Sequence, residues 1–388
     1  MSTALFLFNH DAPHQVAHLA GVAAAFARAY PQHRTLVAYA TPAIRRTIER
    51  LLPPNALDDA QWHELSLPAW SRLTAPLDQV LPASRLLRLR QHTGLFASAD
   101  AVISTERTCL HAKRFIAPAD MPRFIRIPHG AGDRKVTYHP DYKRFDLILL
   151  AGQKAVDQLA AMGVARDRLR ITGYPKFDTV DVSARRRFFG TDRPTFVYNP
   201  HFDPHLSSWY DAGPALLEWF ASAEGQQFNC IFAPHVMLFR KRLHMSPEYR
   251  VARVRPGIPA VARAADNILI DLASPRLFDM SYMLGADAYI GDASSQVYEF
   301  LLRPRSVFIL DARGALQAEK ETLPFLQAGP RCGSVGALTQ ALTSWRNISG
   351  QYSAAQRALF DLTFAPSDKP SSQRAAEAIA QALREWES

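Results

Sequence analysis

Residues 277–310 read LFDMSYMLGADAYIGDASSQVYEFLLRPRSVFIL, and they show the fold class most directly. Two apolar runs in this stretch, Ala288–Ile290 and Val307–Leu310, have the continuity expected of buried strands. The segments Leu277–Leu284 and Ser295–Leu302 carry apolar residues at helical spacing. A helix, a strand, a second helix and a second strand in this order predict parallel β-α-β packing. We therefore expect an α/β protein.

The same alternation extends over most of the chain. Before residue 178 the predicted strands are Ala4–Phe8, Thr35–Tyr39, Glu64–Leu67, Ala101–Ser104, Phe124–Ile127, Leu147–Leu150 and Leu169–Thr172. After residue 194 they are Thr195–Tyr198, Asn229–Ala233 and Asn267–Ile270, in addition to the two above. Predicted helices lie between them, at Gln15–Ala29, Ala43–Leu52, Ala155–Met162 and Ala215–Ala223. The pattern predicts two doubly wound, Rossmann-like domains.

The pattern pauses at residues 178–194, DTVDVSARRRFFGTDRP, which have little apolar period and end in proline. We therefore expect an N-terminal domain over residues 1–180 and a C-terminal domain over residues 195–335. Residues 336–388 should form helices that pack back on the N-terminal domain. The two sheets should face one cleft with the carboxyl ends of their strands, where ligands of open α/β sheets bind.

The composition excludes several protein classes. The chain has 388 residues, 48% of them hydrophobic and 21% charged, which is typical of a globular protein and not of a disordered one. No apolar run approaches the roughly 20 residues that cross a bilayer. The three cysteines lack metal-ligand or disulfide spacing, and residues 1–9 lack signal-peptide features. We expect a cytoplasmic protein without a metal site.

The net charge favours an anionic partner. Lysine and arginine number 45 against 36 acidic residues, giving +9, which suits nucleotides, nucleic acid or an anionic membrane face. The alternative is a compositional bias toward arginine with no partner. The basic clusters are Arg85, Arg88 and Arg90; Arg185, Arg186 and Arg187; and Arg240, Lys241 and Arg242. The last two adjoin apolar residues, as in surfaces that contact lipid headgroups, although such clusters are also found as solvated faces.

Two loops of the first half place polar residues just after predicted strands. His129 and Gly130 follow the strand FIRI, where a histidine suits a general base or phosphate contact and a glycine lets backbone approach a ligand. The turn TGYPKFD contains Gly173 and Lys176, whose ammonium can meet a phosphate. The structural alternatives are a packing histidine and a plain interdomain turn.

Two loops of the second half also begin with histidines. His201 follows a strand in YNPHFD, and Pro234 and His235 follow the strand NCIF. A single histidine is more often structural than catalytic, but strand-end histidines in both halves favour a functional site. They also favour an enzyme over a protein that only binds.

The loop after Ala288–Ile290 is the most specific candidate. Asp292 or Ser294 can cap the next helix, whose first amides and positive end attract an anion. Glu299 lies one turn beyond Ser295, so it would reach a ribose while the serines hold phosphate. The alternative is a capped helix with a solvated glutamate.

Absent motifs narrow the chemistry. The chain has no GxxxxGK[ST], strand-linked GxGxxG, HExxH, CxxC or GxSxG sequence. These absences exclude P-loop kinases, classical dinucleotide enzymes, zincins and zinc ribbons, and weaken a serine hydrolase. No RNA- or DNA-recognition signature accompanies the positive charge, so we expect no nucleic-acid partner.

The succession HG, GYPKFD, YNPHFD, APH and SYMLGADAYIGDASSQVYEF resembles the CDP-glycerol glycerophosphotransferases of teichoic-acid and capsule synthesis, over about residues 129–310. Those enzymes have the GT-B fold and are related in fold to UDP-N-acetylglucosamine 2-epimerases. The resemblance implies that His129 is the catalytic base, that His235 contacts phosphate, and that Ser294, Ser295 and Glu299 hold the nucleotide. The loop HGAGDRK departs from the family's usual HG-Thr-Pro, which leaves donor and acceptor open.

The implied enzyme is a transferase whose acceptor hydroxyl attacks the glycerol-bearing phosphate of CDP-glycerol and releases CMP. It would need no metal or other cofactor, would bind the donor in its C-terminal domain, and would work at the inner face of the plasma membrane if the acceptor is a lipid-linked glycan. The alternatives are a GT-B glycosyltransferase that uses a nucleotide sugar, a 2-epimerase, and a two-lobed anion-binding protein.

Overall fold

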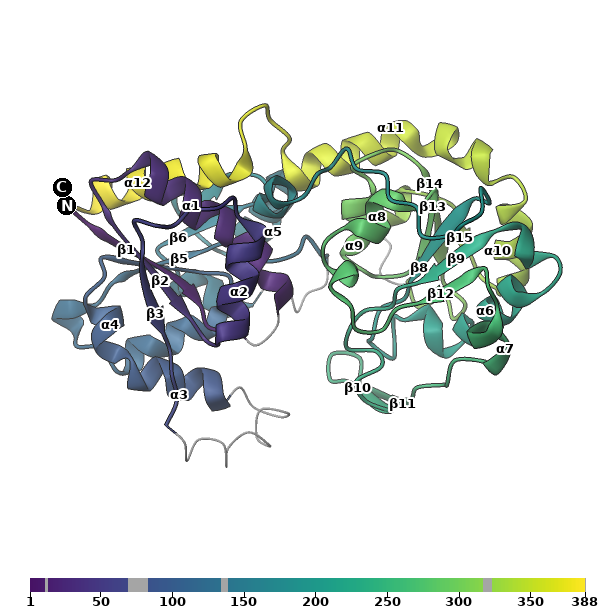
Figure 1. Cartoon of the computed structure of the whole chain (residues 1–388), viewed down its shortest axis with the longest axis horizontal. Coiled ribbons are helices and arrows are strands. Elements are labelled where there is room, and N and C mark those ends of the chain that lie inside the picture. The colour runs from purple at the N-terminus through teal and green to yellow at the C-terminus, as the bar shows by residue number, and fades with distance from the viewer. Residues whose placement is uncertain (11–12, 69–82, 134–138, 317–322, 388) are drawn as a thin grey trace. The chain divides into compact units, whose positions relative to one another are not determined.

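The computed structural model describes residues 1–10, 13–68, 83–133, 139–316 and 323–387. Its contacts divide the chain into two compact units, each built on a parallel sheet (Figure 1). Unit 1 comprises Met1–His129, Tyr138–Asp181 and Leu362–Ser388, and unit 2 comprises Gly130–Thr137 and Val182–Asp361. The prediction of an α/β protein with two Rossmann-like sheets and C-terminal helices is confirmed.

Unit 1 has a seven-stranded sheet with the order β3-β2-β1-β4-β5-β6-β7. The strands are β1 (Thr3–Phe8), β2 (Arg34–Tyr39), β3 (Gln61–Glu64), β4 (Ala101–Ser104), β5 (Arg123–Arg126), β6 (Leu147–Leu150) and β7 (Leu169–Ile171). The interior strand β1 is apolar from Ala4 to Phe8 because both of its faces are covered. Phe6 and Phe8 pack into one hydrophobic cluster and Leu5 and Leu7 into another, as the alternation of side chains along a strand requires.

Helices cover both faces of this sheet. Those of unit 1 are α1 (Ala20–Ala29), α2 (Pro42–Leu51), α3 (Ala83–Gln91), α4 (Thr93–Ala97), α5 (Gln153–Ala161) and α12 (Ser371–Glu387). Helix α12 lies against α1, and its small residues Ala375, Ala376 and Ala380 are buried with Ile379. Small residues on this face allow the two helices to approach closely. The last helix of the chain is thus part of the core of unit 1.

Unit 2 has a six-stranded sheet with the order β12-β9-β8-β13-β14-β15. The strands are β8 (Thr195–Asn199), β9 (Asn229–Phe232), β12 (Ile268–Ile270), β13 (Ala288–Gly291), β14 (Ser306–Leu310) and β15 (Arg331–Cys332). The chain leaves β8 toward β9 on one side and returns to β13 on the other. The loops after β8 and β13 therefore diverge at a topological switch point, where doubly wound sheets bind ligands.

The helices of unit 2 are α6 (Gly213–Ala221), α7 (Ala260–Ala264), α8 (Ser281–Gly285), α9 (Gln296–Phe300), α10 (Val335–Leu342) and α11 (Trp345–Phe364), the last of which contains the boundary between the units. Two helices of unit 2, α8 and α9, are shorter than the sequence predicts. The helix predicted over residues 277–284 is interrupted at Met280, whose φ of 64° is left-handed. Asp279 then accepts the Ser281 amide at 2.9 Å, so α8 begins only there.

Two further findings concern a small hairpin, which the sequence pattern did not reveal, and the length of the helices. The strands β10 (Leu243–Ser246) and β11 (Val251–Val254) form an antiparallel hairpin outside the six-stranded sheet. Among the helices that the structure describes, none is both long enough and apolar enough to cross a bilayer.

Candidate active site

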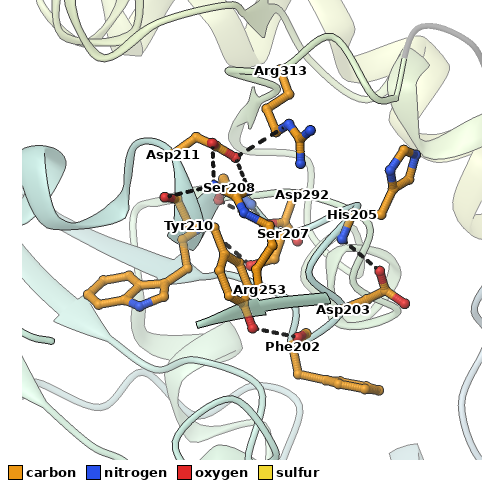
Figure 2. A network of polar contacts seen from close by, with 11 residues as sticks. Phe202, Asp203, His205, Ser207, Ser208, Tyr210, Asp211, Arg253, Asp292 and Arg313 are labelled. Atoms are coloured by element: carbon orange, nitrogen blue, oxygen red, sulfur yellow. Dashed lines mark hydrogen bonds and ion pairs between the residues drawn. The ribbon is translucent and has the colours of Figure 1, made fainter. Parts of the chain in front are cut away.

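Asp292 joins the two loops at the switch point of unit 2. It is the first residue after β13 and is buried. Its Oδ1 accepts the His201 amide at 2.8 Å. Its Oδ2 accepts the amide and hydroxyl of Ser208 at 2.6 and 2.7 Å (Figure 2). Burial raises the pKa of Asp292 to about 7, although the three hydrogen bonds favour the ionised form. The carboxylate accepts hydrogen bonds from the loop after β8 and does not cap α9.

Two histidines come together beside this carboxylate. The rings of His201 and His235 lie 5.1 Å apart, and the His235 amide donates to the Pro200 carbonyl at 2.9 Å. Nδ1 of His201 accepts the Asp203 amide at 3.1 Å, and Nδ1 of His235 accepts the Met237 amide at 3.2 Å. Because Nδ1 is the acceptor in both neutral rings, the proton is on Nε2. Both histidines therefore present an Nε2–H donor.

Ser294 and Ser295 belong to the loop after β13, here called the serine loop. Because β13 is the strand next to β8, this loop begins at the same edge of the sheet as the loop of His201. Ser294 is buried and its Oγ accepts the Gln296 amide at 3.3 Å, so Ser294 and not Asp292 caps the first turn. Ser295 makes no side-chain cap of α9. Glu299 is buried, which argues against a merely solvated side chain. Helix α9 has only five residues, so its dipole contributes little to anion binding.

The loop Gly130–Asp133, which follows the HG motif, is grouped with unit 2. Asp133 accepts the Tyr298 hydroxyl at 2.5 Å. Gly130 has a φ of 84°, and a Cβ there would lie 3.8 Å from Ser295 Oγ. Glycine is thus favoured by the backbone conformation at this position and not by a lack of space, because a Cβ would make an ordinary van der Waals contact with Ser295. Arg134 and Lys135 of the same motif lie outside the described residues.

The hairpin β10–β11 supports the loop after β8, which the sequence did not reveal. Ser246 of β10 donates to Asp203 Oδ2 at 2.8 Å, while Oδ1 accepts the His205 amide at 2.9 Å. Arg253 of β11 makes two hydrogen bonds of 2.7 Å to Asp211 (Figure 2). Paired contacts from a rigid hairpin restrict the loop that carries His201.

His129, in unit 1, has the opposite protonation pattern. Its Nδ1–H donates to the Thr105 carbonyl at 3.2 Å, which makes Nε2 the unprotonated nitrogen of the neutral ring. Burial, with a smaller effect of the positive charge of Arg126, lowers the pKa of His129 to about 4. A value near 6.5, which an unperturbed histidine would have, is therefore wrong for His129. The ring stays neutral at physiological pH and can accept a proton at Nε2.

The surroundings of His129 contain residues that sequence analysis missed. Arg126 is buried at the end of β5, its guanidinium 4.7 Å from the Tyr142 ring, and its Nε and Nη1 have no hydrogen-bond partner among the described residues. His18 lies 6.4 Å from the His129 ring. Arg85 forms an ion pair of 2.8 Å with Glu106. A charged residue inside the apolar strand FIRI was the available signal for Arg126.

The GYPKFD motif has a clear packing role. Gly173 has a φ of 84°, and the space that a Cβ would occupy is filled by Arg374 and Ser371. Asp178 accepts the amides of Ser371 and Ser372 at 3.3 and 2.6 Å, which caps the start of α12. Lys176 is buried within the same turn. The motif therefore docks the C-terminal helix in unit 1.

By sequence, the chain matches no protein-family model and no curated protein. By structure, it is similar to the wall teichoic acid polymerase TagF, with a TM-score of 0.61 and 14% identity over 99% of this chain and 89% of that one. It is also similar to UDP-GlcNAc 2-epimerase from Neisseria meningitidis, with a TM-score of 0.58 and 11% identity over 99% and 100% of the two chains.

A third similar structure is MnaA of S. aureus in complex with UDP, with a TM-score of 0.58 and 13% identity over 100% of this chain and 97% of that one. The chain has the GT-B fold. The GT-B fold accounts for the two Rossmann-like units and the terminal helices, as the resemblance of the sequence implied. Because a polymerase and epimerases share the GT-B fold, the choice between these chemistries rests on the site residues.

One basic cluster of unit 2 lies away from these loops. Arg185, Arg186 and Arg187 line a cavity of about 570 Å³ with the half-buried Phe188, beside the starts of β8 and β14 and thus at the amino ends of the strands. Among the described residues, no three histidine, cysteine or acidic side chains gather as a metal site requires.

Proposed function

We propose that the protein is a transferase that moves glycerol phosphate, or a related polyol phosphate, from a CDP-activated donor to a hydroxyl acceptor in cell-surface polymer synthesis. The observation that carries this proposal is the contrast in histidine tautomers. His129 offers a proton acceptor, whereas His201 and His235 offer paired donors. Attack of a hydroxyl on the diphosphate of such a donor is assisted by both kinds of group, one that takes the proton and others that stabilise the negative charge.

Unit 2 would bind the donor. The Nε2–H groups of His201 and His235 suit two oxygens of a diphosphate, because their rings are 5.1 Å apart at the switch point. The hydroxyls of Ser294 and Ser295 add neutral donors, and the buried Glu299 suits a ribose hydroxyl. Asp292 acts as a positioning residue, since its oxygens are hydrogen-bonded to the loop that bears His201.

His129 would act as the general base. Nε2 takes the proton of the acceptor hydroxyl while that oxygen forms a bond to the glycerol-bearing phosphorus. The bond from this phosphorus to the bridging oxygen breaks, and CMP leaves with that oxygen. Base assistance of this kind contributes about 100- to 10,000-fold in rate. No metal ion or other cofactor takes part in the mechanism.

The comparisons support a nucleotide-activated donor without choosing its head group. One similar structure is a TagF variant soaked with CDPG, and two others carry UDP or UDP-GlcNAc. The second candidate is therefore an enzyme that acts on a UDP-sugar, either a glycosyltransferase or an epimerase. The order of motifs from HG to the serine loop favours the CDP-activated donor.

A ligand panel tests the proposal. Thermal unfolding is measured with CDP-glycerol, CDP-ribitol, CMP, UDP, UDP-sugars and GDP-sugars, all at one common concentration. A ligand present at about 100 times its Kd stabilises the fold by about 2.7 kcal/mol, and a weaker ligand stabilises it less. Cytidine nucleotides should give the largest shift, and CDP-glycerol with a hydroxyl acceptor should yield CMP. The Ser294→Ala/Ser295→Ala double variant should fold normally and show a smaller shift. A shift with UDP-sugars alone favours the second candidate, and saturable binding without turnover leaves only a binding protein.

A further inference from the structure

The hairpin β10–β11 exposes an apolar face. Leu243 and Met245 of β10 are 54% and 69% exposed, and Val254 of β11 is 63% exposed. Leu243 is paired with Val254 and Met245 with Ala252, so these four side chains occupy one face of the hairpin. Soluble proteins expose single apolar residues routinely, but a contiguous cross-strand group of this kind indicates a contact surface.

The opposite face of the hairpin is anchored. His244 and Ser246 are buried, and Ser246 donates to Asp203 at 2.8 Å. Arg253 is paired with Asp211. Figure 1 shows the hairpin at the periphery of unit 2, apart from its six-stranded sheet. The apolar face is therefore held outward by the packing of the other face.

Basic residues border the apolar face. Arg240, Lys241 and Arg242 directly precede β10, and Arg250 directly precedes β11; all four are exposed. None of the four forms an ion pair with another described residue. Aliphatic side chains surrounded by unpaired cations match the interface of an anionic bilayer, where the apolar groups enter the headgroup layer and the cations remain among the phosphates.

We propose that this hairpin docks unit 2 on an anionic lipid surface. A second copy of the chain is a weaker occupant, because a two-fold contact through this face would bring identical basic residues together. The cluster Arg185–Arg187 is not equivalent, since Phe188 beside it is half-buried in the wall of a cavity. The hairpin also supports the loop that carries His201, so the docking surface adjoins the proposed donor site of unit 2. The proposal does not depend on which donor is used.

Vesicle flotation of the full chain tests the docking surface. Binding is compared on vesicles of phosphatidylcholine alone and of phosphatidylcholine mixed with phosphatidylglycerol, without any nucleotide. We expect binding to the anionic vesicles only, with release by salt. Replacing Arg240, Lys241 and Arg242 by serine should weaken binding roughly 100-fold, since each cation near the surface is worth about fivefold. The Leu243→Asp/Met245→Asp variant should weaken it at least about tenfold.

Matched control variants distinguish a specific effect of the hairpin on vesicle binding from effects of the overall charge and hydrophobicity of the protein. Serine at residues 185, 186 and 187 removes the same charge elsewhere, and Val261→Asp changes an isolated residue that is 56% exposed. Both should bind within about twofold of wild type, because neither lies on the docking surface. Equal losses in controls and hairpin variants would overturn the proposal, as would the absence of binding to anionic vesicles. A dimer in light scattering that Leu243→Asp/Met245→Asp dissociates, with vesicle binding unchanged, would assign the face to a second copy instead.

Discussion

Histidines follow strands in both units, yet their rings are prepared for opposite tasks. In unit 1 the partner of His129 Nδ1 is a backbone carbonyl, which can only accept, so the ring keeps its proton on Nδ1. In unit 2 the partners of His201 and His235 are backbone amides, which can only donate, so the proton moves to Nε2. The backbone of the loop, and not the identity of the side chain, decides which ring nitrogen of each histidine carries the proton.

Replacing the base should have the largest effect. His129→Ala is expected to reduce turnover by about 100- to 10,000-fold, because the acceptor hydroxyl loses its proton acceptor. Nucleotide affinity should stay near wild type, since unit 2 would hold the donor. CMP release and nucleotide titration measure the two quantities. Full turnover in a folded His129→Ala variant would remove the base from the mechanism.

The second largest effect is expected on the stability of the fold when Asp292, which anchors the loop of His201, is replaced. Asp292→Ala leaves two buried amides and a hydroxyl without their acceptor, which we expect to lower the free energy of unfolding by about 3 kcal/mol. Urea titration measures the change. Asp211→Ala is the control, because its partner Arg253 is partly exposed and the loss should be about 1 kcal/mol or less. Equal losses in the two variants would show that Asp292 is not a special anchor.

A donor histidine should behave differently from the base. His235→Ala is expected to weaken donor binding about tenfold and to lower turnover as well, because a phosphate contact acts in both the ground and transition states. Titration with CDP-glycerol and steady-state rates give the two values. If donor affinity is unchanged while turnover falls as in His129→Ala, the two histidines do not have the separate roles proposed here.

The smallest effect concerns acidic pH. Protonation of His129 abolishes its function as a base, so kcat/KM should fall only as the pH drops toward about 4, the value to which burial lowers its pKa. Arg126→Met removes a nearby positive charge and should move the fall to higher pH. The profile of kcat/KM against pH in both proteins checks this. A fall centred near 6.5 in wild type would mean that His129 is exposed to water when it acts.

Much of this architecture was predictable from local sequence. The runs Ala101–Ser104 and Leu147–Leu150 have the predicted bounds of β4 and β6, because continuous apolar residues reflect burial on both faces. The hairpin was not predictable, since the alternation of apolar and polar residues in β10 covers only four positions and the apolar residues are the exposed ones. The helix predicted over residues 277–284 was too long because the residue types there do not predict the left-handed backbone conformation of Met280.

The sequence alone determined the succession of strands and helices and the residues that leave the strands, because both depend on short-range periodicity. Only the tertiary structure decided that Asp292 anchors the loop of His201, that Asp178 caps a helix almost two hundred residues later, and that His129 and His235 carry their protons on different nitrogens. These properties are set by partners distant in sequence or by the conformation of the loop backbone. A pattern of residue types contains neither, since both arise only when the chain is packed.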